Sequence, residues 1–567
     1  MTPGKNLIVF DTEDDSSELL KRGGSGFDKK LTQIAAISSN GKRFYNAGAV
    51  KPFLKWCHET GGDVWAFNAQ YDIGNLCHAG EINLDDFDLT LVKGRFIKGK
   101  FQGLNFYDVH NLSGAGSSVK SLGLAVGLPK FGADYSAKEL RVFSAKRRAE
   151  FFAFNKTGAE KFADPRYVFR DCEIPLRWLE FVADQADEIG VESLPATLGG
   201  LCVKTFAAMG GQNWFQADDE TAAALIGARV ELFSGGGKGR ICYADVNSLY
   251  PWCMTQLFPV CVEDLDGSLD GYGIADCLVD VPDQEITPLP YRDGDGRLIF
   301  PVGKFRGVWT LAEIRNAVNF AGAKVKKVYW SHGSKHGKAF YRDYITSIYG
   351  KRMAATSPAE NLFWKLLLNN LYGRLAISGE VSRSLILTDE NKDRGLAYGG
   401  KVLVDHKMPL PVFSNYMHAA HVLSYARIKL FSYLKMIPAK DLIYCDTDSV
   451  IFFCKDQPPF PASRDLGAMK IEAWGARCKP YLPKTYIFDN TYKAKGVPKS
   501  RARDFIETGR AEYDLPFKLR EAIHFYNAEN TRKLSVWRKV EKIRAAVYDR
   551  KKICGKYFLP IKLNEAK

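Results

Sequence analysis

Apolar residues recur in strand-like runs through the first third of the chain. Four segments have the length and the β-branched or aromatic content of strands: 6–10 (NLIVF), 30–38 (KLTQIAAIS), 63–68 (DVWAFN) and 104–109 (LNFYDV). Stretches with helical periodicity follow them, such as 173–189 (EIPLRWLEFVADQADEI). This mixture predicts an α/β unit over residues 1–188, with a boundary near Gly190.

The pattern changes repeatedly after this unit. Residues 240–254 begin as a strand and end in a turn, whereas 257–345 are rich in Gly, Pro and Asp and indicate an inserted domain with short strands and a helix near 311–320. The remaining elements, in chain order, are a helical hairpin (346–378), a β-rich hairpin excursion (379–411), a helix (418–434) and the strand-like run YCDTDSV (444–450). From residue 501 onward we expect a small helical lobe.

Length and composition place the chain among soluble, multi-domain proteins. Its 567 residues exceed a single core, and 46% apolar residues are enough to bury several. No apolar run approaches the roughly 20 residues of a membrane span, and the start MTPGKNLIVFDTEDD lacks the pattern of a secretion signal. The twelve cysteines contain no CxxC pair, which favours reduced thiols over disulfides or zinc. We therefore expect a cytoplasmic protein, in the host cytoplasm if viral, with no membrane partner.

The positive charge is concentrated toward the end of the chain. The formal net charge is +14, and residues 501–567 contain 17 Lys or Arg against 9 Asp or Glu. Such a surface suits a polyanion, with nucleic acid as the leading candidate. An ordinary solvated face explains the charge equally well, so charge alone leaves both interpretations open.

Paired acids in the run YCDTDSV point to chemistry. Alternation along a strand directs Asp446 and Asp448 to the same face, where two like charges are costly unless a cation lies between them. Four other segments share this character. Asp11 and Glu13 follow the first strand, Asp72 closes the run FNAQYD, and Tyr167 and Asp171 are four residues apart on an expected helix; Asp245 ends a further apolar strand.

Each of these acids alone is most simply a capping or turn aspartate. Together, without a Cys/His cluster, they form the oxygen-only donor set that magnesium or manganese prefers. Two such ions about 3.5 to 4 Å apart can activate an attacking oxygen and stabilise a leaving one in phosphoryl transfer. The sequence therefore predicts Mg²⁺ or Mn²⁺, two ions per active site.

Seven motifs in order resemble those of family B DNA polymerases. DTE at Asp11, NAQYD at Asn68 and YVFRD at Tyr167 look like the three exonuclease motifs. DVNSLYP at Asp245, KLLLNNLYG at Lys365, YCDTDS at Tyr444 and KTYI at Lys484 look like polymerase motifs A, B and C and the later KxY motif. The insertions at 257–345 and 379–411, with FSGG from Phe233 to Gly236, resemble the protein-primed branch.

The resemblance implies a mixed α/β, multi-domain fold. An RNase H-like 3′–5′ exonuclease domain (1–188) would precede a polymerase with palm, fingers and thumb. The implied parts are the palm (189–256 and 412–512), an insertion that contacts a priming protein and DNA (257–345), fingers (346–378), a β-hairpin insertion for strand displacement (379–411) and thumb (513–567). The implied partners are a DNA template and primer strand, deoxynucleoside triphosphates (dNTPs) and a terminal, priming protein, with the enzyme a monomer.

In the polymerase site, the resemblance assigns roles to individual residues. Asp245 and Asp448 would be the main metal ligands, with Asp446 beside them and the carbonyl of Val246 helping. The dNTP-binding residues would be Leu249, Tyr250, Lys365, Asn369 and Tyr372, with Tyr250 rejecting a 2′ hydroxyl and Lys351 and Arg352 as further phosphate contacts. The DNA contacts would be Phe233, Gly235, Gly236, Gly373, Lys484 and Tyr486.

In the exonuclease site, four carboxylates would hold two ions against the last phosphodiester of a frayed 3′ end. These are Asp11, Glu13, Asp72 and Asp171, with Tyr167 orienting the attacking water. Asn68 and Tyr71 would contact single-stranded DNA, and Lys130 and Tyr135 occupy positions where the branch keeps assisting residues.

Three positions depart from the family pattern. Asn370 stands where Ser is usual, Val109 and His110 replace a Ser/Thr-Leu pair, and Phe233 replaces Tyr and so lacks a hydroxyl that reaches DNA. Other functions remain open: a family B polymerase that starts from a nucleic-acid primer or de novo, a nuclease whose polymerase half only binds DNA, and a noncatalytic DNA-binding scaffold. The intact acids at 245, 446 and 448 argue against the last two.

Overall fold

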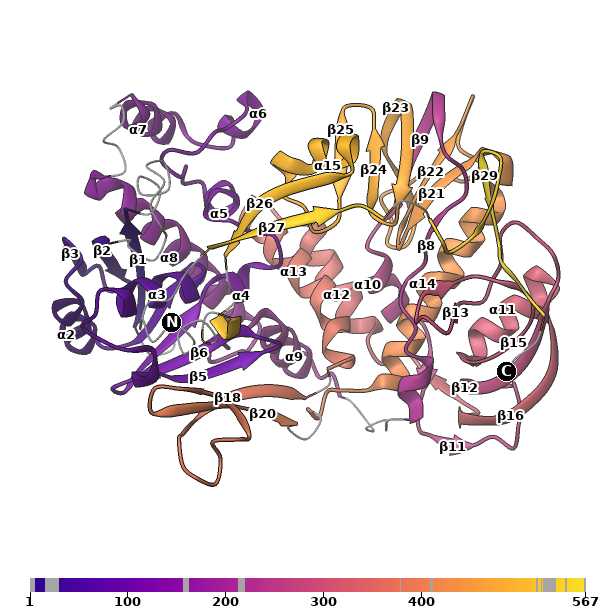
Figure 1. Ribbon diagram of the computed structural model, residues 1–567, viewed down its shortest axis with the longest axis horizontal. Helices are drawn as coiled ribbons and strands as arrows, with labels where there is room; N and C mark the ends of the chain where they lie inside the picture. The colour runs from indigo at the N-terminus through magenta and orange to yellow at the C-terminus, as the bar shows by residue number, and fades with distance from the viewer. Residues whose placement is uncertain are drawn as a thin grey trace.

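The structure is a computed structural model, and it confirms a mixed α/β architecture made of several parts (Figure 1). It describes residues 6–15, 30–156, 163–212, 220–377, 379–407, 411–516, 519–521, 523, 537–545 and 548–564. Within these ranges, two large sheets and one smaller sheet organise the molecule. Every helix in these ranges is too short or too polar to cross a bilayer.

The first sheet contains the strands expected near the start of the chain. Its N-terminal strands are β1 (Leu7–Asp14), β2 (Leu31–Ser38), β3 (Arg43–Asn46), β4 (Asp63–Ala66), β5 (Asp88–Val92), β6 (Arg95–Phe101) and β7 (Leu104–Asp108). β1 lies between antiparallel β2 and parallel β4. The long helix α8 (Pro165–Glu188) packs on β1 and β2, and its buried residues from Ile174 to Ala186, around Trp178, are apolar.

Shorter helices complete this N-terminal unit. They are α2 (Val50–Thr60), α3 (Ala69–His78), α4 (His110–Ser113), α5 (Val119–Val126), α6 (Ala137–Leu140) and α7 (Ala145–Asn155). Helix α5 packs on α8. Ser118 caps α5 by accepting a hydrogen bond from the backbone of Ser121, which satisfies one of the amides left free at a helix start.

The excursion expected at 379–411 is a hairpin, and it extends the first sheet. Strands β18 (Glu380–Ile386), β19 (Gly395–Tyr398) and β20 (Lys401–Lys407) add to the edge at β5. Ser382 and Arg383 of β18 pair with Leu91 and Thr90 of β5. Figure 1 shows this orange hairpin lying along the N-terminal strands, so a single sheet of ten described strands joins segments about three hundred residues apart.

The second sheet carries polymerase motifs A and C and the KxY motif, whereas motif B lies on a helix. Its order is β25 (Thr491–Ala494), β24 (Thr485–Phe488), β23 (Met469–Leu482), β9 (Gly237–Val246), β22 (Ser449–Phe453), β21 (Leu442–Asp446) and β8 (Val230–Leu232). The helices that accompany it are α9 (Leu198–Ala208), α10 (Leu249–Met254), α12 (Arg342–Met353), α13 (Pro358–Leu375) and α14 (Tyr416–Met436). The expected helical hairpin at 346–378 is confirmed as α12 and α13, which pack together.

The segment 257–345 forms its own sheet and core, as expected, but its main strands are long. β12 (Tyr272–Val281) lies between β15 (Val302–Thr310) and β16 (Lys324–Ser334), and these three strands are flanked by β11 (Glu263–Asp264) and by β30 (Lys562–Leu563). Helix α11 (Leu311–Ala321) matches the helix expected near 311–320. Two short pairs, β10 (Phe258–Pro259) with β17 (Gly337–Lys338) and β13 (Tyr291–Arg292) with β14 (Leu298–Ile299), complete it.

The expectation of a helical C-terminal lobe is wrong for the described residues. Apart from the short α15 (Ala502–Thr508) and helical residues at 519–521 and 523, the elements are strands: β26 (Arg510–Pro516), β27 (Trp537–Ile543), β28 (Lys552–Cys554) and β29 (Tyr557–Leu559). Residues 537–543 read WRKVEKI, whose apolar residues are three apart and lack the two-residue alternation of a strand, so the sequence pattern does not reveal β27. Most of residues 517–536 lie outside the described ranges.

Candidate active sites

The exonuclease-like acids meet where β1 faces α8. Asp11 and Glu13 lie inside β1, not after it as expected, and their spacing of two places both on one side of the strand. Asp171, in the first turns of α8, completes the group. One carboxylate oxygen from each of the three residues lies within 4.8 Å of the others. This confirms that three of the four predicted acids converge.

The fourth predicted acid, Asp72, is held apart from this group by Thr12. Its Oδ1 accepts hydrogen bonds from the Thr12 amide at 3.0 Å and from the Thr12 hydroxyl at 2.7 Å. Thr12 stands between Asp11 and Glu13 and points to the opposite side of β1. Asp72 is 1% exposed, on α3, and its charge still raises the pKa of Asp11 after the larger effect of burial.

A lysine partly neutralises the three-acid group. Lys130 Nζ donates a hydrogen bond to Asp171 Oδ2 and lies 4.8 Å from the centre of the Tyr167 ring. The amide of Lys130 donates to the Tyr135 hydroxyl at 2.9 Å. The structure therefore brings Lys130, Tyr135 and Tyr167 to the site that the sequence assigned to them, with Lys130 in direct contact with a carboxylate.

Two predicted single-strand contacts lie at the start of α3. Asn68 is exposed, in a left-handed conformation with φ 68°, and its amide donates to Asp108 Oδ1 at 2.9 Å. Tyr71 is half-buried, and its hydroxyl donates to Asp14 Oδ2 at 2.8 Å. Tyr71 thus lies against the strand that carries Asp11 and Glu13, and contact with DNA by both residues stays a prediction.

Burial disfavours the charged forms of these carboxylates, and a bound cation would stabilise those forms. Burial, followed by the nearby charge of Asp171, raises the pKa of Glu13 to about 7. Burial also raises the pKa of Asp11 and Asp171. Asp171 Oδ1 is buried and has no hydrogen-bond partner among the described residues. An oxygen-only set with one unsatisfied buried oxygen fits a hard divalent ion.

In the polymerase-like site, the acids of YCDTDSV lie in a turn, which corrects the expectation of a single strand. Asp446 ends β21 and pairs with Ser449, the first residue of β22, so Thr447 and Asp448 form a two-residue loop. Thr447 has φ 61°, a left-handed conformation that such tight hairpin loops require. Apolar runs on both sides had hidden this turn, because neither Gly nor Asn marks it.

Strand pairing brings Asp245 beside this turn. Asp245, near the end of β9, lies directly opposite Ser449, and the Val246 amide donates to the Asp448 carbonyl at 2.7 Å. Burial, then the charge of Asp448, raises the pKa of Asp245 to about 7. Burial raises the pKa of Asp448 to about 6. The predicted pair of main ligands is thus adjacent and mutually repulsive, which fits a divalent ion between them.

Asp446 differs from its two neighbours because it already has a cation. Lys484 Nζ lies 2.8 Å from Asp446 Oδ1, and the Tyr444 hydroxyl donates to Oδ2 at 3.3 Å. Tyr486 is 5% exposed and packs on Tyr444, with ring centroids 5.4 Å apart. The KxY residues therefore adjoin the catalytic turn, on a cavity of about 410 Å³ lined by Tyr243, Asp446, Thr447, Asp448, Ser449, Lys484, Tyr486 and Lys493.

Sequence reasoning missed Lys470. Its Nζ lies 3.8 Å from Asp245 Oδ1 and 2.6 Å from Glu472 Oε1, because β23 pairs with β9 in a register that sets Lys470 opposite Asp245. The side chain is 40% exposed. No motif marks this position, and only the pairing of two strands far apart in sequence reveals it.

The predicted nucleotide-binding residues gather on α10 and α13. The rings of Tyr250 and Tyr372 stack with centroids 4.8 Å apart and planes inclined by 13°. Lys365, Asn369 and Gly373 follow one exposed ridge of α13, while Leu249 is buried. Arg352 donates to the Ser248 hydroxyl at 3.2 Å, next to motif A, whereas the Lys351 ammonium lies 5.1 Å from the Trp364 ring.

The FSGG segment is covered by the C-terminal tail. Phe233 is 5% exposed, under the ammonium of Lys551 at 3.9 Å from its ring centre. The Gly235 amide donates to the Lys556 carbonyl at 2.8 Å. Gly236 has φ 71°, and a Cβ there would lie 2.2 Å from the Cys478 carbonyl oxygen, so glycine is required. DNA contact by these residues stays a prediction.

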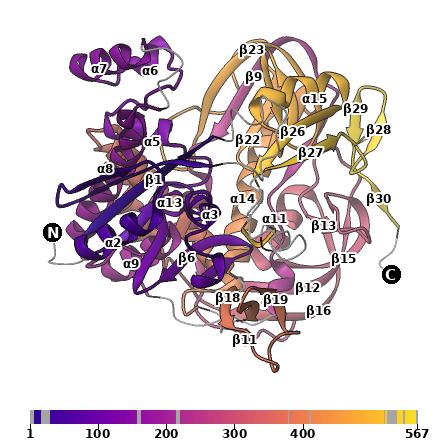
Figure 2. The same cartoon turned by 60° about the vertical axis from the view of Figure 1, so that its left-hand side comes forward.

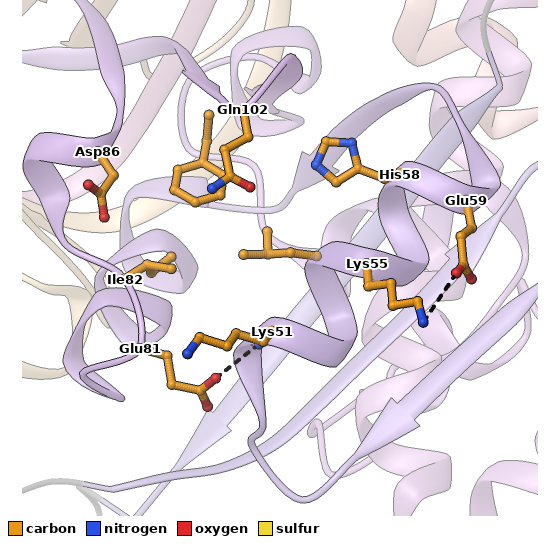
Figure 3. A pocket seen from close by; sticks show the side chains of 10 residues that line it. Lys51, Lys55, His58, Glu59, Glu81, Ile82, Asp86 and Gln102 are labelled. Carbon is orange, nitrogen blue, oxygen red and sulfur yellow. Dashed lines mark hydrogen bonds and ion pairs between the residues drawn. The ribbon is translucent and has the colours of Figure 1, made fainter.

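A cavity of about 590 Å³ lies elsewhere on the N-terminal unit, between α2 and β6 (Figure 3). Its lining mixes Lys51, Lys55 and His58 with Glu59, Glu81 and Asp86. The carboxylate of Glu81 accepts hydrogen bonds from the amides of Val50 and Lys51, and so occupies the start of α2. None of the predicted site residues lines this cavity.

Comparison with known proteins supports the polymerase-like assignment. The family described as DNA polymerase type B, organellar and viral, matches residues 216–448. A probable DNA polymerase of Ascobolus immersus is 26% identical over 302 residues, covering 48% of this chain and 24% of that protein. One of Neurospora intermedia is 26% identical over 332 residues, covering 49% and 32% respectively. The chain thus spans a third or less of the length of these curated relatives.

Among solved structures, the Phi29 DNA polymerase complexed with primer-template DNA and incoming nucleotide substrates has the same fold. The TM-score is 0.66 at 15% sequence identity, over 96% of this chain and 99% of that chain. At this identity the likeness concerns the fold. Over residues 216–448 the chain is similar in sequence to type B DNA polymerases of the organellar and viral kind, and its fold is that of the Phi29 DNA polymerase.

Proposed function

We propose that the protein is a replicative DNA-directed DNA polymerase with a 3′–5′ proofreading exonuclease. The observation that carries the proposal is the placement of Asp245, near the end of β9, and Asp448, in the adjoining turn, beside the stacked pair Tyr250 and Tyr372. Two repelling carboxylates next to an aromatic platform and an exposed lysine ridge fit a triphosphate held by divalent ions over a base pair.

For nucleotide addition, Asp245 and Asp448 would hold the ions, with the Val246 carbonyl beside them. Magnesium or manganese, two ions per site, would supply charge neutralisation and a nucleophilic 3′ oxygen. Lys365 and Arg352 would bind the triphosphate, and Tyr250 would exclude a 2′ hydroxyl. Lys484 would release Asp446 and bind the primer strand. Asn369, Tyr372 and Gly373 would lie along the nascent base pair and template.

For proofreading, Asp11, Glu13 and Asp171 would hold the ions, and Asp72 would contribute from the far side of Thr12. Lys130, which is hydrogen-bonded to Asp171, and Tyr167, whose ring faces the Lys130 ammonium, would orient the attacking water and the scissile phosphate. Asn68 and Tyr71, at the start of α3, would bind the frayed strand.

Protein priming and strand displacement are a further part of the proposal. The insertion 257–345 forms a separate sheet with its own core, and the hairpin β18–β20 joins the exonuclease-like sheet. Both features accompany an overall likeness to the Phi29 polymerase fold. A family B polymerase that starts from a nucleic-acid primer or de novo is the second candidate, and labelled dNTP would become covalently bound to a partner protein only under protein priming.

The two activities should be separable by single substitutions. Asp448→Asn should lower nucleotide incorporation on a primed template by about a thousandfold or more and leave 3′ degradation of single-stranded DNA intact. Asp11→Asn should do the reverse. Loss of both activities from either change, with an unchanged melting temperature, would contradict two independent sites.

A further inference from the structure

Three buried charged side chains lie directly behind the turn that carries Asp446 and Asp448. Arg229, Glu231 and Lys551 are 1%, 3% and 5% exposed. Arg229 Nε donates to Glu231 Oε2 at 2.5 Å, and Lys551 Nζ lies 3.1 Å from Glu231 Oε1. Buried charges cost stability unless they are paired, so loss of the shared carboxylate would leave two cations without their partner.

The cluster is attached to the catalytic turn through the backbone. β8 pairs with β21 so that Glu231 lies opposite Cys445 and Val230 opposite Asp446. The Thr447 amide donates to the Arg229 carbonyl at 2.8 Å. The first residue of the two-residue loop is therefore held by the same residue whose guanidinium forms the ion pair.

The same arginine reaches into the inserted domain. Arg229 Nη1 donates to the Thr287 carbonyl at 2.8 Å, and its guanidinium lies 4.3 Å from the centre of the Phe300 ring. Thr287 in turn donates its hydroxyl to the Phe300 carbonyl at 2.8 Å. Arg229 thus joins the catalytic sheet to the segment 257–345.

The third member, Lys551, comes from the C-terminal tail. Beyond it the tail follows FSGG, with the Phe558 amide donating to the Phe233 carbonyl at 2.9 Å. The tail then ends as β30, paired with β15 of the inserted domain. Figures 1 and 2 both show the yellow tail running from β29 to the C-terminus beside the strands of that domain.

The cluster acts on the site without touching it. Successive residues of a strand point to opposite faces, so Glu231, opposite Cys445, lies on the face away from the Asp446 carboxylate. Burial raises the pKa of Glu231, but Arg229 and Lys551 lower it further, and the net pKa lies below the usual value. Glu231 is therefore an ionised anchor between two cations.

We propose that Arg229, Glu231 and Lys551 are positioning residues that fix the Asp446–Asp448 turn to the inserted domain and the C-terminal tail. This rests on the proposed polymerase function. The network sets the geometry of nucleotide transfer, while the three-acid site on β1 and α8 does not depend on it. Because displacement of catalytic groups by about 1 Å can cost about 100-fold in rate, a defect here changes kcat more than KM.

The test compares single and paired substitutions in the full chain, with steady-state dNTP incorporation on a primed template. Glu231→Gln should lower kcat by about 10-fold to 100-fold and change the KM for dNTP by less than about 3-fold. Lys551→Met should lower kcat by about 10-fold. The double variant should be no worse than Glu231→Gln alone, because both changes break one pair. Lys562→Met, on an exposed tail lysine paired with Asp283, is the matched control and should keep full activity.

Degradation of single-stranded DNA reports folding in every variant and should stay within about 2-fold of the unsubstituted protein. Multiplicative defects in the double variant, an unchanged kcat, or a change confined to KM would overturn the positioning role. If Glu231→Gln loses both activities, Lys551→Met tests the positioning role instead, by its kcat, its KM for dNTP and its degradation of single-stranded DNA. An unsubstituted protein that degrades DNA but incorporates no dNTP would instead overturn the proposed polymerase function, and the positioning role with it.

Discussion

The two acid sites solve the same electrostatic problem in different ways. On β1 and α8, three carboxylates converge within 4.8 Å, and a lysine from a distant loop is hydrogen-bonded to one of them. On the second sheet, Asp245 and Asp448 lie side by side. The nearby lysines, Lys484 and Lys470, form their shortest ion pairs with Asp446 and Glu472 respectively. In the first site, a largely buried lysine offsets part of the negative charge. In the second site, the negative charge of Asp245 and Asp448 is left for a bound ion to neutralise.

This difference predicts unequal dependence on the neighbouring lysines. Lys130→Met removes a cation whose side chain is 21% exposed and leaves the nearly buried Asp171 carboxylate without its partner. Exonuclease activity should fall by about 10-fold to 100-fold, as for other residues that support metal ligands. Hydrolysis of a 3′-labelled oligonucleotide measures the loss.

Nucleotide incorporation by Lys130→Met serves as the control and should be unchanged, since Lys130 contacts Asp171, Tyr167 and Tyr135 of the N-terminal unit. A variant with full exonuclease activity would show that Lys130 only screens charge.

The central pair of the polymerase-like site should make the metal-free protein sensitive to pH. The pKa of Asp245 is raised to about 7 and that of Asp448 to about 6, chiefly by burial. Between about pH 4 and 7 the folded protein binds more protons than the unfolded chain, so the free energy of unfolding falls as pH rises. In EDTA, Asp245→Asn should therefore melt higher than the unsubstituted protein at pH 8, by several degrees, and at the same temperature near pH 4.

Adding MgCl₂ at pH 8 should close this gap, because bound ions take over the role of the lost protons. The measurement is a thermal melt in EDTA and in MgCl₂ at each pH. A gap of equal size at both pH values would mean that the Asp245 charge does not destabilise the fold.

The smallest effect is expected at Lys470. Its side chain is 40% exposed and already bound to Glu472, so water and the second carboxylate screen its interaction with Asp245. Lys470→Met should change nucleotide incorporation by less than about 3-fold, because exposed ion pairs contribute about 1 kcal/mol or less. Steady-state primer extension would measure this change. If Lys470→Met lowered nucleotide incorporation as much as Lys130→Met lowers exonuclease activity, the two sites would not differ in their dependence on a neighbouring lysine.

Local signals predicted much of the fold and of both sites. The apolar runs at 6–10, 30–38, 63–68 and 104–109 lie in strands, and the helical hairpin and the helix containing 418–434 were predicted correctly. The local sequence signals failed where the structure depends on a contact between residues far apart in the chain. The DTD turn carries no Gly or Asn, and the hairpin at 379–411 gives no sign that it pairs with β5.

By itself, the sequence predicted which residues would carry the chemistry, because acids spaced by two or four residues and embedded in apolar runs are recognisable in any fold. Tertiary structure alone decided which cation each acid receives: Lys130 for Asp171, Lys484 for Asp446, and none so close for the pair Asp245 and Asp448. It also decided that Arg229, Glu231 and Lys551 meet behind the catalytic turn. The physical reason is that charge neutralisation depends on distance and burial, and strand pairing between remote segments sets both.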